Sequence, residues 1–301
     1  TFNGVILISK GDSVLYQTTK GYANIAQKDT LRLDHQFVIG SISKQITAVL
    51  ILQAYEKGLL DLETPIAKYL PDLSLAWKDS INIHHLLIHK HGIQSLDEAL
   101  AFPPDRQFQY SQLGYELLAQ ILEQVHQQPF VTISSRLFQE NGLKNTFHPQ
   151  NKGYKNLANG YTEDENGNLV YETQSFENYV PAGGFISTAQ DLTKWNLLLH
   201  QGKLLKQNTL QLMSVKQATR QHPIFNAIDY GYGLTFKAEE QKLQIGALGF
   251  APGFVSSNFY FPATGISLII LENVAANLGD FTQTFYYHTN TIALLRTELS
   301  I

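Results

Sequence analysis

Apolar and polar positions alternate along residues 4–23, as they do in a β-strand with one buried face. The run GVILISKGDSVLYQTTKGYA has a Gly-Asp pair near its middle. Such a pair between two alternating runs is typical of a hairpin turn. The sequence therefore predicts an antiparallel hairpin over residues 4–23.

The apolar period lengthens after residue 40. The positions that recur at helical spacing are Ile42, Ile46, Val49, Leu50 and Ala54. Gly58 follows where a helix would end, because glycine readily adopts the backbone conformation found after a helix. We expect a helix over residues 42–58 with one apolar face.

The middle of the chain, about residues 60–150, reads mostly as helices and loops. The clearest segments are INIHHLLIHKHG at 81–92 and SQLGYELLAQILEQVHQQPF at 111–130, each closed by glycine or proline. Asn166-Gly167 between two apolar runs then predicts a second hairpin. A helix over residues 187–203 is expected to be capped by Ser187 or Thr188.

The last third of the chain returns to strand patterns. Three strand-like runs cover residues 230–238, 253–262 and 265–273, and a final helix is predicted over 280–299. Strands at both ends of the chain are expected to join in one antiparallel sheet flanked by helices. We therefore predict a single α+β domain over residues 1–301, with one lobe from about 1–55 and 180–301 and a mainly helical lobe from about 56–179.

Composition excludes several classes of function. The chain has 301 residues, of which 44% are hydrophobic, and a net charge of −4, so it can bury a large core but presents no broad basic field for nucleic acid. It contains no cysteine, which removes disulfides, thiolate nucleophiles and cysteine-ligated metals. No apolar run is long enough to span a bilayer, and no targeting segment is visible.

Candidate catalytic residues stand near residue 40, where the strand-like pattern changes to the helical one. Ser41, Ser43 and Lys44 stand there, although a helix cap needs only one serine and the helix dipole disfavours a lysine in the first turn. Ser41 and Lys44 are three residues apart and would share one helix face. A lysine near the positive helix end and shielded from water loses its proton more readily, and the neutral amine can then accept the serine proton. The spacing also fits an ordinary N-cap, and Ser43 is the second candidate nucleophile.

The stretch FVIGSISKQITA, residues 37–48, resembles the nucleophile region of the serine β-lactamase and penicillin-binding protein superfamily. It is most similar to the branch that holds class C β-lactamases, D-Ala-D-Ala carboxypeptidases and related esterases. Further stretches that are similar to the family and in its order are INIHHLLIHKHGI, PPDRQFQYSQLGYELLAQILE, FQENGLKNTF, PAGGFISTAQDLTKW and GALGFAPGF. The resemblance implies a β-lactamase-like fold, an acyl-enzyme mechanism, no cofactor, and a periplasmic or secreted location.

The resemblance also implies roles for individual residues. Ser41 would be the acylated nucleophile, Lys44 its proton partner, and Tyr110 a second base or acid. A phenol beside a lysine is favoured as phenolate, which suits Tyr110 for proton relay; the alternative is an aromatic residue that caps the following helix. The oxyanion hole would be formed by the backbone N–H groups of Ser41 and Phe250.

Two positions depart from the family pattern in the expected substrate-binding region. Gln112 stands where the family has asparagine, which keeps the amide but adds one methylene. Ala247, Leu248 and Gly249 stand where the family has Lys-Thr-Gly or His-x-Gly, so a cation or imidazole is missing. Recognition of a substrate carboxylate, as in β-lactams or D-alanyl peptides, is therefore put in doubt.

A metal site is considered and not expected. The histidines are clustered at His84, His85, His89 and His91. His85 and His89 form an i,i+4 pair, but no HExxH pattern or carboxylate partner accompanies them.

Two functions remain open. The first is a serine hydrolase that acts on small esters or amides, with esterase favoured over D-Ala peptidase or β-lactamase. The second is a catalytically degenerate relative that binds a peptide or small ligand in the same cleft. A small-molecule or peptide substrate is the expected partner, and the sequence leaves the oligomeric state undetermined.

Overall fold

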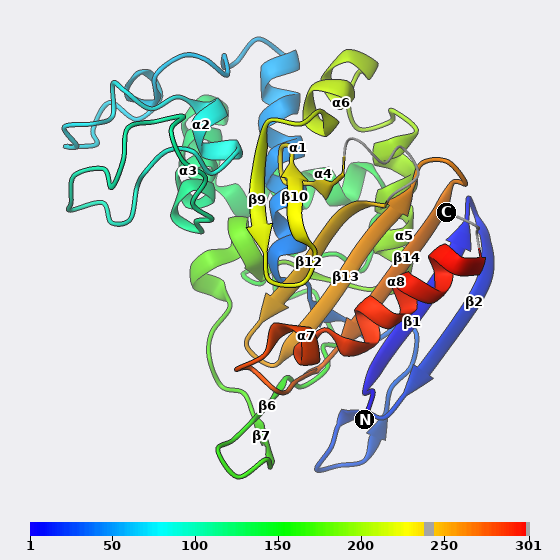
Figure 1. Cartoon of the computed structure of the whole chain (residues 1–301). Helices are drawn as coiled ribbons and strands as arrows, with labels where there is room; N and C mark the ends of the chain where they lie inside the picture. Colours follow the sequence, from blue (N-terminus) through cyan, green and yellow to red (C-terminus); the bar gives the residue numbers. More distant parts are fainter. Residues whose placement is uncertain (238–243, 299–301) are drawn as a thin grey trace.

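The computed structural model describes residues 1–237 and 244–298, and its centre is an eight-stranded sheet (Figure 1). The strand order is β2-β1-β14-β13-β12-β11-β10-β9, and every neighbouring pair is antiparallel. The bounds are β1 Gly4–Lys10, β2 Ser13–Lys20, β9 Ala218–His222, β10 Asn226–Tyr230, β11 Thr235–Phe236, β12 Ile245–Ala251, β13 Phe254–Phe261 and β14 Ile266–Glu272. The prediction that strands from both ends of the chain join in one sheet is confirmed.

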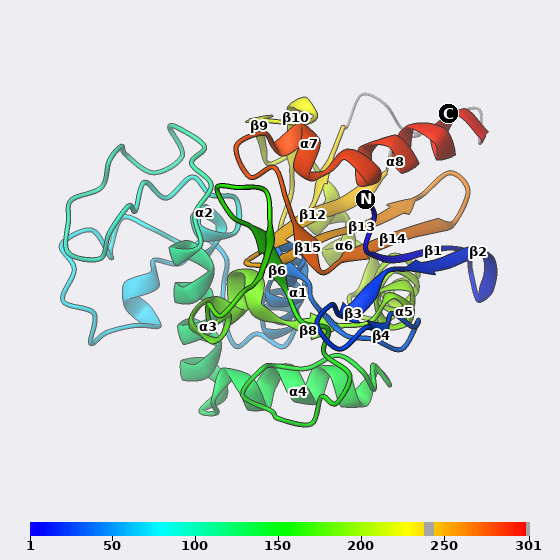
Figure 2. The same cartoon turned by 90° about the horizontal axis from the view of Figure 1, so that it is seen from below.

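Helices cover both faces of this sheet (Figure 2). All seven residues of β14 are buried, because alternate side chains enter two different cores. Ile269 and Leu271 belong to the larger core with α5 (Ala189–His200), whereas Leu268 and Ile270 pack with Ile292 of α8 (Tyr286–Glu298). The apolar run at 265–273 is therefore a central strand, and the α+β prediction is confirmed.

The predicted hairpins form at the predicted turns. β1 and β2 are joined through Gly11 and Asp12, and a second hairpin joins β6 (Tyr161–Glu163) to β7 (Leu169–Tyr171). β6 also pairs in parallel with β15 (Val274–Ala275). Small two-stranded pairs complete the sheets: β3 Tyr22–Asn24 with β4 Asp29–Thr30, and β5 Phe37–Val38 with β8 Ile186–Ser187.

The first long helix, α1 (Ser43–Glu56), is buried on all sides rather than on one face as expected. All ten residues from 43 to 52 are buried, including the polar Ser43, Gln45 and Thr47. A helix that is surrounded in this way lies in the centre of its domain. Gly58 ends the segment with φ 70°, as the sequence predicts.

The remaining helices lie around α1 and the sheet. Their bounds are α2 Ile83–Leu87, α3 Leu113–His126, α4 Phe130–Glu140, α6 Gln207–Ser214 and α7 Phe281–Thr284. Thr188 caps α5, since its hydroxyl accepts the N–H of Asp191 at 3.2 Å. The predicted C-terminal helix is divided into α7 and α8, and residue 299 of that prediction lies outside the described residues. Within the described ranges, no helix has both the length and the apolar character needed to cross a membrane.

Three strands of the sheet were not predicted: β9, β12 and, apart from its last residue, β10. β12 contains Gly246 and Gly249, which weaken a strand pattern, and β9 consists mainly of polar residues. The predicted strand over residues 230–238 is also interrupted, because Gly233 has φ 69° between β10 and β11. Residue 238 lies outside the described residues.

Candidate active site

Ser41 lies in a short turn of helix, η1 (Gly40–Ile42), between β5 and α1. Gly40 has φ 54°, and a Cβ atom there would lie 2.4 Å from the backbone nitrogen of Phe250. Only glycine fits a positive φ and so close an approach of two backbones. The glycine before Ser41 thus allows η1 to lie directly against β12.

Lys44 is the buried cation of the site, with 1% of its surface exposed. Its Nζ donates to Ser41 Oγ at 3.3 Å and to the carbonyl oxygen of Ala182 at 2.8 Å. No ion pair to Lys44 is present in the described part of the chain. The carboxyl of Glu116 feels the charge of Lys44 but does not pair with it directly. A buried ammonium without an ion pair is costly, and such groups are concentrated at functional sites.

Ser43, the alternative nucleophile, has a different environment. It is fully buried, and its Oγ accepts the backbone N–H of Phe185 at 3.2 Å. Ser41 is partly exposed, and its hydroxyl contacts Lys44. The arrangement therefore favours Ser41 over Ser43 as the reacting serine.

The segment PAGGF, which the sequence places among the family-like motifs, holds α1 from the side. It forms η4 (Val180–Gly184), where the carbonyl of Pro181 accepts the Thr47 hydroxyl at 2.7 Å and that of Ala182 accepts Lys44. Two adjacent carbonyls thus bind side chains one turn apart on α1. These bonds fix the direction in which the lysine points.

Tyr110 lies in the loop before α3, and its ring is beside Lys44. Its ring centroid is 4.6 Å from Lys44 Nζ, and 38% of the residue is exposed. Removal from water raises the pKa of the phenol, but the Lys44 charge, the Ser41 hydroxyl and, less strongly, Arg220 outweigh it, so the net pKa is lowered. The residue at the N-cap of α3 is Gln112, and the hydroxyl of Ser111 before it accepts the N–H of Gly114 at 3.4 Å, so Tyr110 does not cap the helix.

His89 supports Tyr110 from behind. It is fully buried, and its ring centroid is 4.4 Å from that of Tyr110. Its Nδ1 accepts the N–H of Ser111 at 3.2 Å, so in the neutral ring Nε2 carries the proton and donates to the Tyr230 hydroxyl at 3.0 Å. Burial and then the Lys44 charge hold the pKa of His89 well below its ordinary value, so the ring is neutral.

The other histidines also have local partners. His85 Nδ1 accepts the N–H of Asn82 at 3.2 Å in the cap of α2, and His84 Nδ1 is 2.7 Å from the Tyr232 hydroxyl. His91 Nδ1 accepts the N–H of Ile93 at 3.0 Å. Among the described residues, no group of three or more histidine or acidic side chains could hold a metal ion.

The expected oxyanion hole and substrate region lie on β12. A Cβ atom on Gly249 would be 2.2 Å from the carbonyl oxygen of Ile39, and Ser256 Oγ donates to that carbonyl at 2.8 Å. The segments that carry the N–H groups of Ser41 and Phe250 are therefore in direct contact. Ala247 is 7% exposed on the same strand and brings no polar group.

Gln112 lies beside η4. Its Oε1 would be 3.7 Å from a Cβ atom on Gly183, the residue after the carbonyl that binds Lys44. The longer amide thus still reaches the edge of η4.

Arg220 is a further charged group at the site that the sequence did not reveal. It lies on β9, and its Cζ is 4.7 Å from the Tyr110 ring centroid and 5.5 Å from that of Phe108. Ala218, Arg220 and His222 alternate with the exposed Thr219 and Gln221. This alternation was the available signal, but a strand so rich in polar residues was not recognised.

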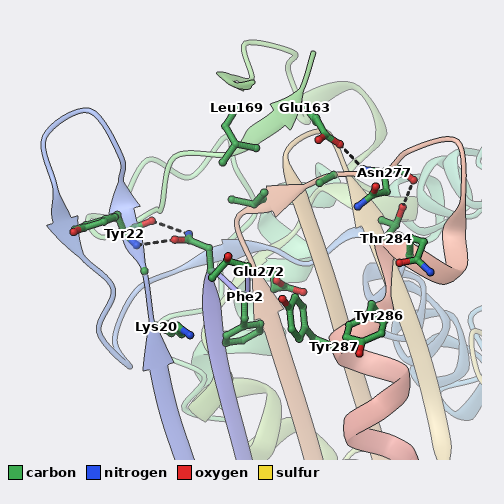
Figure 3. Close-up of a pocket in the computed structure, with 16 residues that line it drawn as sticks. Phe2, Lys20, Tyr22, Glu163, Leu169, Glu272, Asn277, Thr284, Tyr286 and Tyr287 are labelled. Atoms are coloured by element: carbon green, nitrogen blue, oxygen red, sulfur yellow. Dashed lines mark hydrogen bonds between the residues drawn. The ribbon is translucent and has the colours of Figure 1, made fainter. Parts of the chain in front are cut away.

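A separate cavity of about 600 Å³ is lined by N-terminal residues, the end of β2 and the last residue of β14 (Figure 3). Its labelled residues include Phe2, Tyr22, Glu272, Tyr286 and Tyr287. None of the residues expected to take part in the reaction lines it. The chemistry of Ser41 is therefore independent of this cavity.

A comparison with protein families agrees with this geometry. The family model described as "Beta-lactamase" matches residues 2–291, which is nearly the whole chain. The chain belongs to the beta-lactamase family. Membership confirms the expected superfamily and the expectation of a serine hydrolase of this type.

Relatives within and around this family are distant in sequence. Penicillin-binding protein 4* of Bacillus subtilis is 25% identical over 90% of the chain, and Teichoic acid D-alanine hydrolase of Staphylococcus aureus is 23% identical over 82%. The chain spans 68% and 66% of the lengths of these two proteins, about two thirds. D-amino acid amidase from Ochrobactrum anthropi, solved with L-phenylalanine, has the same fold with a TM-score of 0.84 at 22% identity, covering 99% of this chain and 95% of that one.

Proposed function

We propose that the protein hydrolyses small esters or amides through an acyl-enzyme on Ser41, with neutral esters preferred. One observation supports this most strongly: buried Lys44, which forms no ion pair in the described chain, contacts Ser41 Oγ at 3.3 Å and lies 4.6 Å from the Tyr110 ring. Three groups that are useful together in acyl transfer are thus adjacent.

Acylation follows from these positions. The Tyr110 phenolate accepts the proton of the Ser41 hydroxyl while Oγ attacks the substrate carbonyl carbon, and the Lys44 ammonium, which contacts the same oxygen, keeps the phenol ionised. The carbonyl oxygen becomes an oxyanion, which the backbone N–H groups of Ser41 and Phe250 stabilise. The bond to the leaving group then breaks, and the proton passes from the relay to the departing oxygen or nitrogen.

Deacylation repeats the same steps with water. The relay accepts a proton from a water molecule as its oxygen attacks the acyl carbon, and Ser41 Oγ leaves with a proton returned to it. The products are a carboxylic acid and free enzyme. No cofactor is required for either half of the reaction.

The preference for neutral esters rests on β12. Ala247 offers neither a charge nor a hydrogen bond at a position where related enzymes have lysine or histidine. A substrate carboxylate there would lack a charge-assisted hydrogen bond worth about 1.5–3 kcal/mol. Gln112, Leu248 and Gly249 would then border a substrate that is held mainly by its carbonyl oxygen and its apolar groups.

The names of the relatives are consistent with acyl chemistry on small groups. One is named as a hydrolase of teichoic acid D-alanine and another as an amidase of D-amino acids. We infer that this chain also releases a small acyl group, and that it works in the periplasm or outside the cell, as the family resemblance implies. Fractionation of the source cells, with the protein detected by antibody, tests the location.

The competing candidate is a binding protein without turnover. Gln112 and Ala247 favour it, because both change groups that related enzymes use on the substrate. Such a protein would retain the cleft but would neither be acylated nor release product.

Covalent labelling distinguishes the two candidates. The purified chain is treated with a fluorophosphonate probe, and intact mass is measured for the parent, Ser41→Ala and Ser43→Ala proteins. We expect one adduct in the parent and in Ser43→Ala, and none in Ser41→Ala. An adduct that persists without Ser41 overturns the assignment, and an unlabelled parent that also leaves p-nitrophenyl esters intact supports the binding protein.

A further inference from the structure

Arg220 has an unusual environment for an arginine. It is partly buried, and its Nε is enclosed without any hydrogen-bond partner among the described residues. Its guanidinium lies against the rings of Phe108 and Tyr110. An enclosed guanidinium N–H without an acceptor is unfavourable, so an arginine kept in this position calls for an explanation.

The nearest acidic residue on the neighbouring strand does not supply that anion. Asp229 of β10 is paired in register with Thr219, so it lies on the face of the sheet opposite to Arg220. Its Oδ1 is 3.0 Å from Lys216 Nζ and accepts the Thr219 hydroxyl at 3.1 Å. The cation of β9 is therefore directed at an aromatic ring and not at a carboxylate.

We propose that Arg220 is a positioning residue for the acyl-transfer reaction, which acts with Lys44 to keep the Tyr110 ring in place and its phenol ionised. It would supply from β9 the positive charge that Ala247 does not supply from β12. A guanidinium within about 6 Å of a ring centroid attracts the ring, and a phenolate more strongly still. This inference rests on the proposed function of Tyr110 as a proton relay.

The other titratable groups around Tyr110 do not provide this charge. His89 beneath the ring is neutral, because burial and nearby positive charges lower its pKa. Tyr115 of α3 and Tyr230 of β10 are neutral as well, because burial raises the pKa of each phenol. The cations that face Tyr110 in the described chain are thus Lys44 from α1 and Arg220 from β9.

Loss of the Arg220 charge should make the Tyr110 phenol harder to deprotonate. The phenol acts as a base only when it has lost its proton, and Arg220 helps to lower the pKa of Tyr110. Removing the guanidinium should therefore raise the pKa of Tyr110. The acidic limb of kcat/KM should then move to higher pH, with lower activity along that limb.

The experiment compares the parent with Arg220→Gln, Arg220→Lys and a matched control, Arg106→Gln, in which an exposed arginine of the loop before Phe108 is neutralised. Profiles of kcat/KM against pH are measured with neutral p-nitrophenyl acetate. Arg220→Gln should shift the acidic limb to higher pH, whereas Arg220→Lys should shift it less and Arg106→Gln not at all. An unshifted limb in Arg220→Gln overturns the proposal.

A spectroscopic titration tests the same point without catalysis. The ultraviolet absorbance of tyrosinate is titrated in the parent and in Arg220→Gln, each minus its Tyr110→Phe counterpart, so that Tyr110 alone is seen. The difference signal should appear at higher pH without Arg220, even if the parent proves inactive and the proposed function fails. Equal midpoints overturn the proposal, as does an Arg220→Gln protein that loses only nitrocefin turnover, because Arg220 would then bind a substrate anion.

Discussion

Gly40→Ala should damage both the stability and the activity of the protein. The new Cβ atom would lie 2.4 Å from Phe250 N and 2.7 Å from Phe250 O, which are backbone atoms that cannot rotate away. The left-handed backbone at φ 54° costs an L-residue about 1–2 kcal/mol, and overpacking adds about 1–3 kcal/mol. The free energy of unfolding should therefore fall by about 2–5 kcal/mol.

The same change should move Ser41 relative to β12. Because η1 and the Phe250 backbone are in direct contact, relief of the clash must separate the two N–H groups of the proposed oxyanion hole. Loss of one such donor lowers kcat by on the order of 10²-fold or more. Gly58→Ala is the control, since Gly58 also has a positive φ of 70° but no atom within 4 Å of its added Cβ.

Thermal unfolding and the kcat for p-nitrophenyl acetate are measured for all three proteins. Gly58→Ala should lose only the backbone cost, about 1–2 kcal/mol, and keep the activity of the parent. If Gly40→Ala matches Gly58→Ala in both measurements, the close contact of η1 with β12 does not position the nucleophile, and the reasoning above is wrong.

Three more outcomes are expected. Lys44→Ala and Tyr110→Phe should each lower kcat for esters by about 10²-fold or more, and near-parent rates in both would remove the relay. Ala247→His should raise kcat/KM for nitrocefin relative to a neutral ester; an unchanged ratio would show that Ala247 does not set specificity. Burial lowers the pKa of His91 to about 4, so stability should fall as pH decreases from 6.5 towards 4, where only the unfolded chain takes up the proton. His91→Gln should flatten that fall in urea titrations at several pH values, and an unchanged slope would contradict it.

Local patterns in the sequence were sufficient for much of the fold. The hairpin of β1 and β2, the helix α1 and the central strand β14 follow from periodicity and turn residues, because those signals depend on near neighbours. The all-round burial of α1 could not be predicted in the same way. Ser43 and Gln45 interrupt its apolar pattern, and each is buried only because a distant segment offers a partner, Phe185 N and Trp195 Nε1 respectively.

The candidate site also combines residues that local motifs reveal with one that depends on distant contacts. Ser41, Lys44 and Tyr110 were identified from motifs, and the structure brings them together. Arg220 was not identified, because its relation to Tyr110 depends on how the edge of the sheet folds against a loop more than a hundred residues earlier in the chain. Contacts between segments so far apart in the chain do not change the local pattern of apolar and polar residues.

The burial of α1 on all sides also bears on how the site can move. Amides of a helix in the centre of a core exchange with solvent only when the whole domain opens, whereas loops and edge strands open locally. Ser41 and Lys44 therefore share the slowest motions of the molecule, while Tyr110 on its loop and Arg220 on edge strand β9 can adjust on shorter timescales. Ser41 therefore stays in place on these timescales, and substrates are accommodated by movements of the Tyr110 loop and of β9.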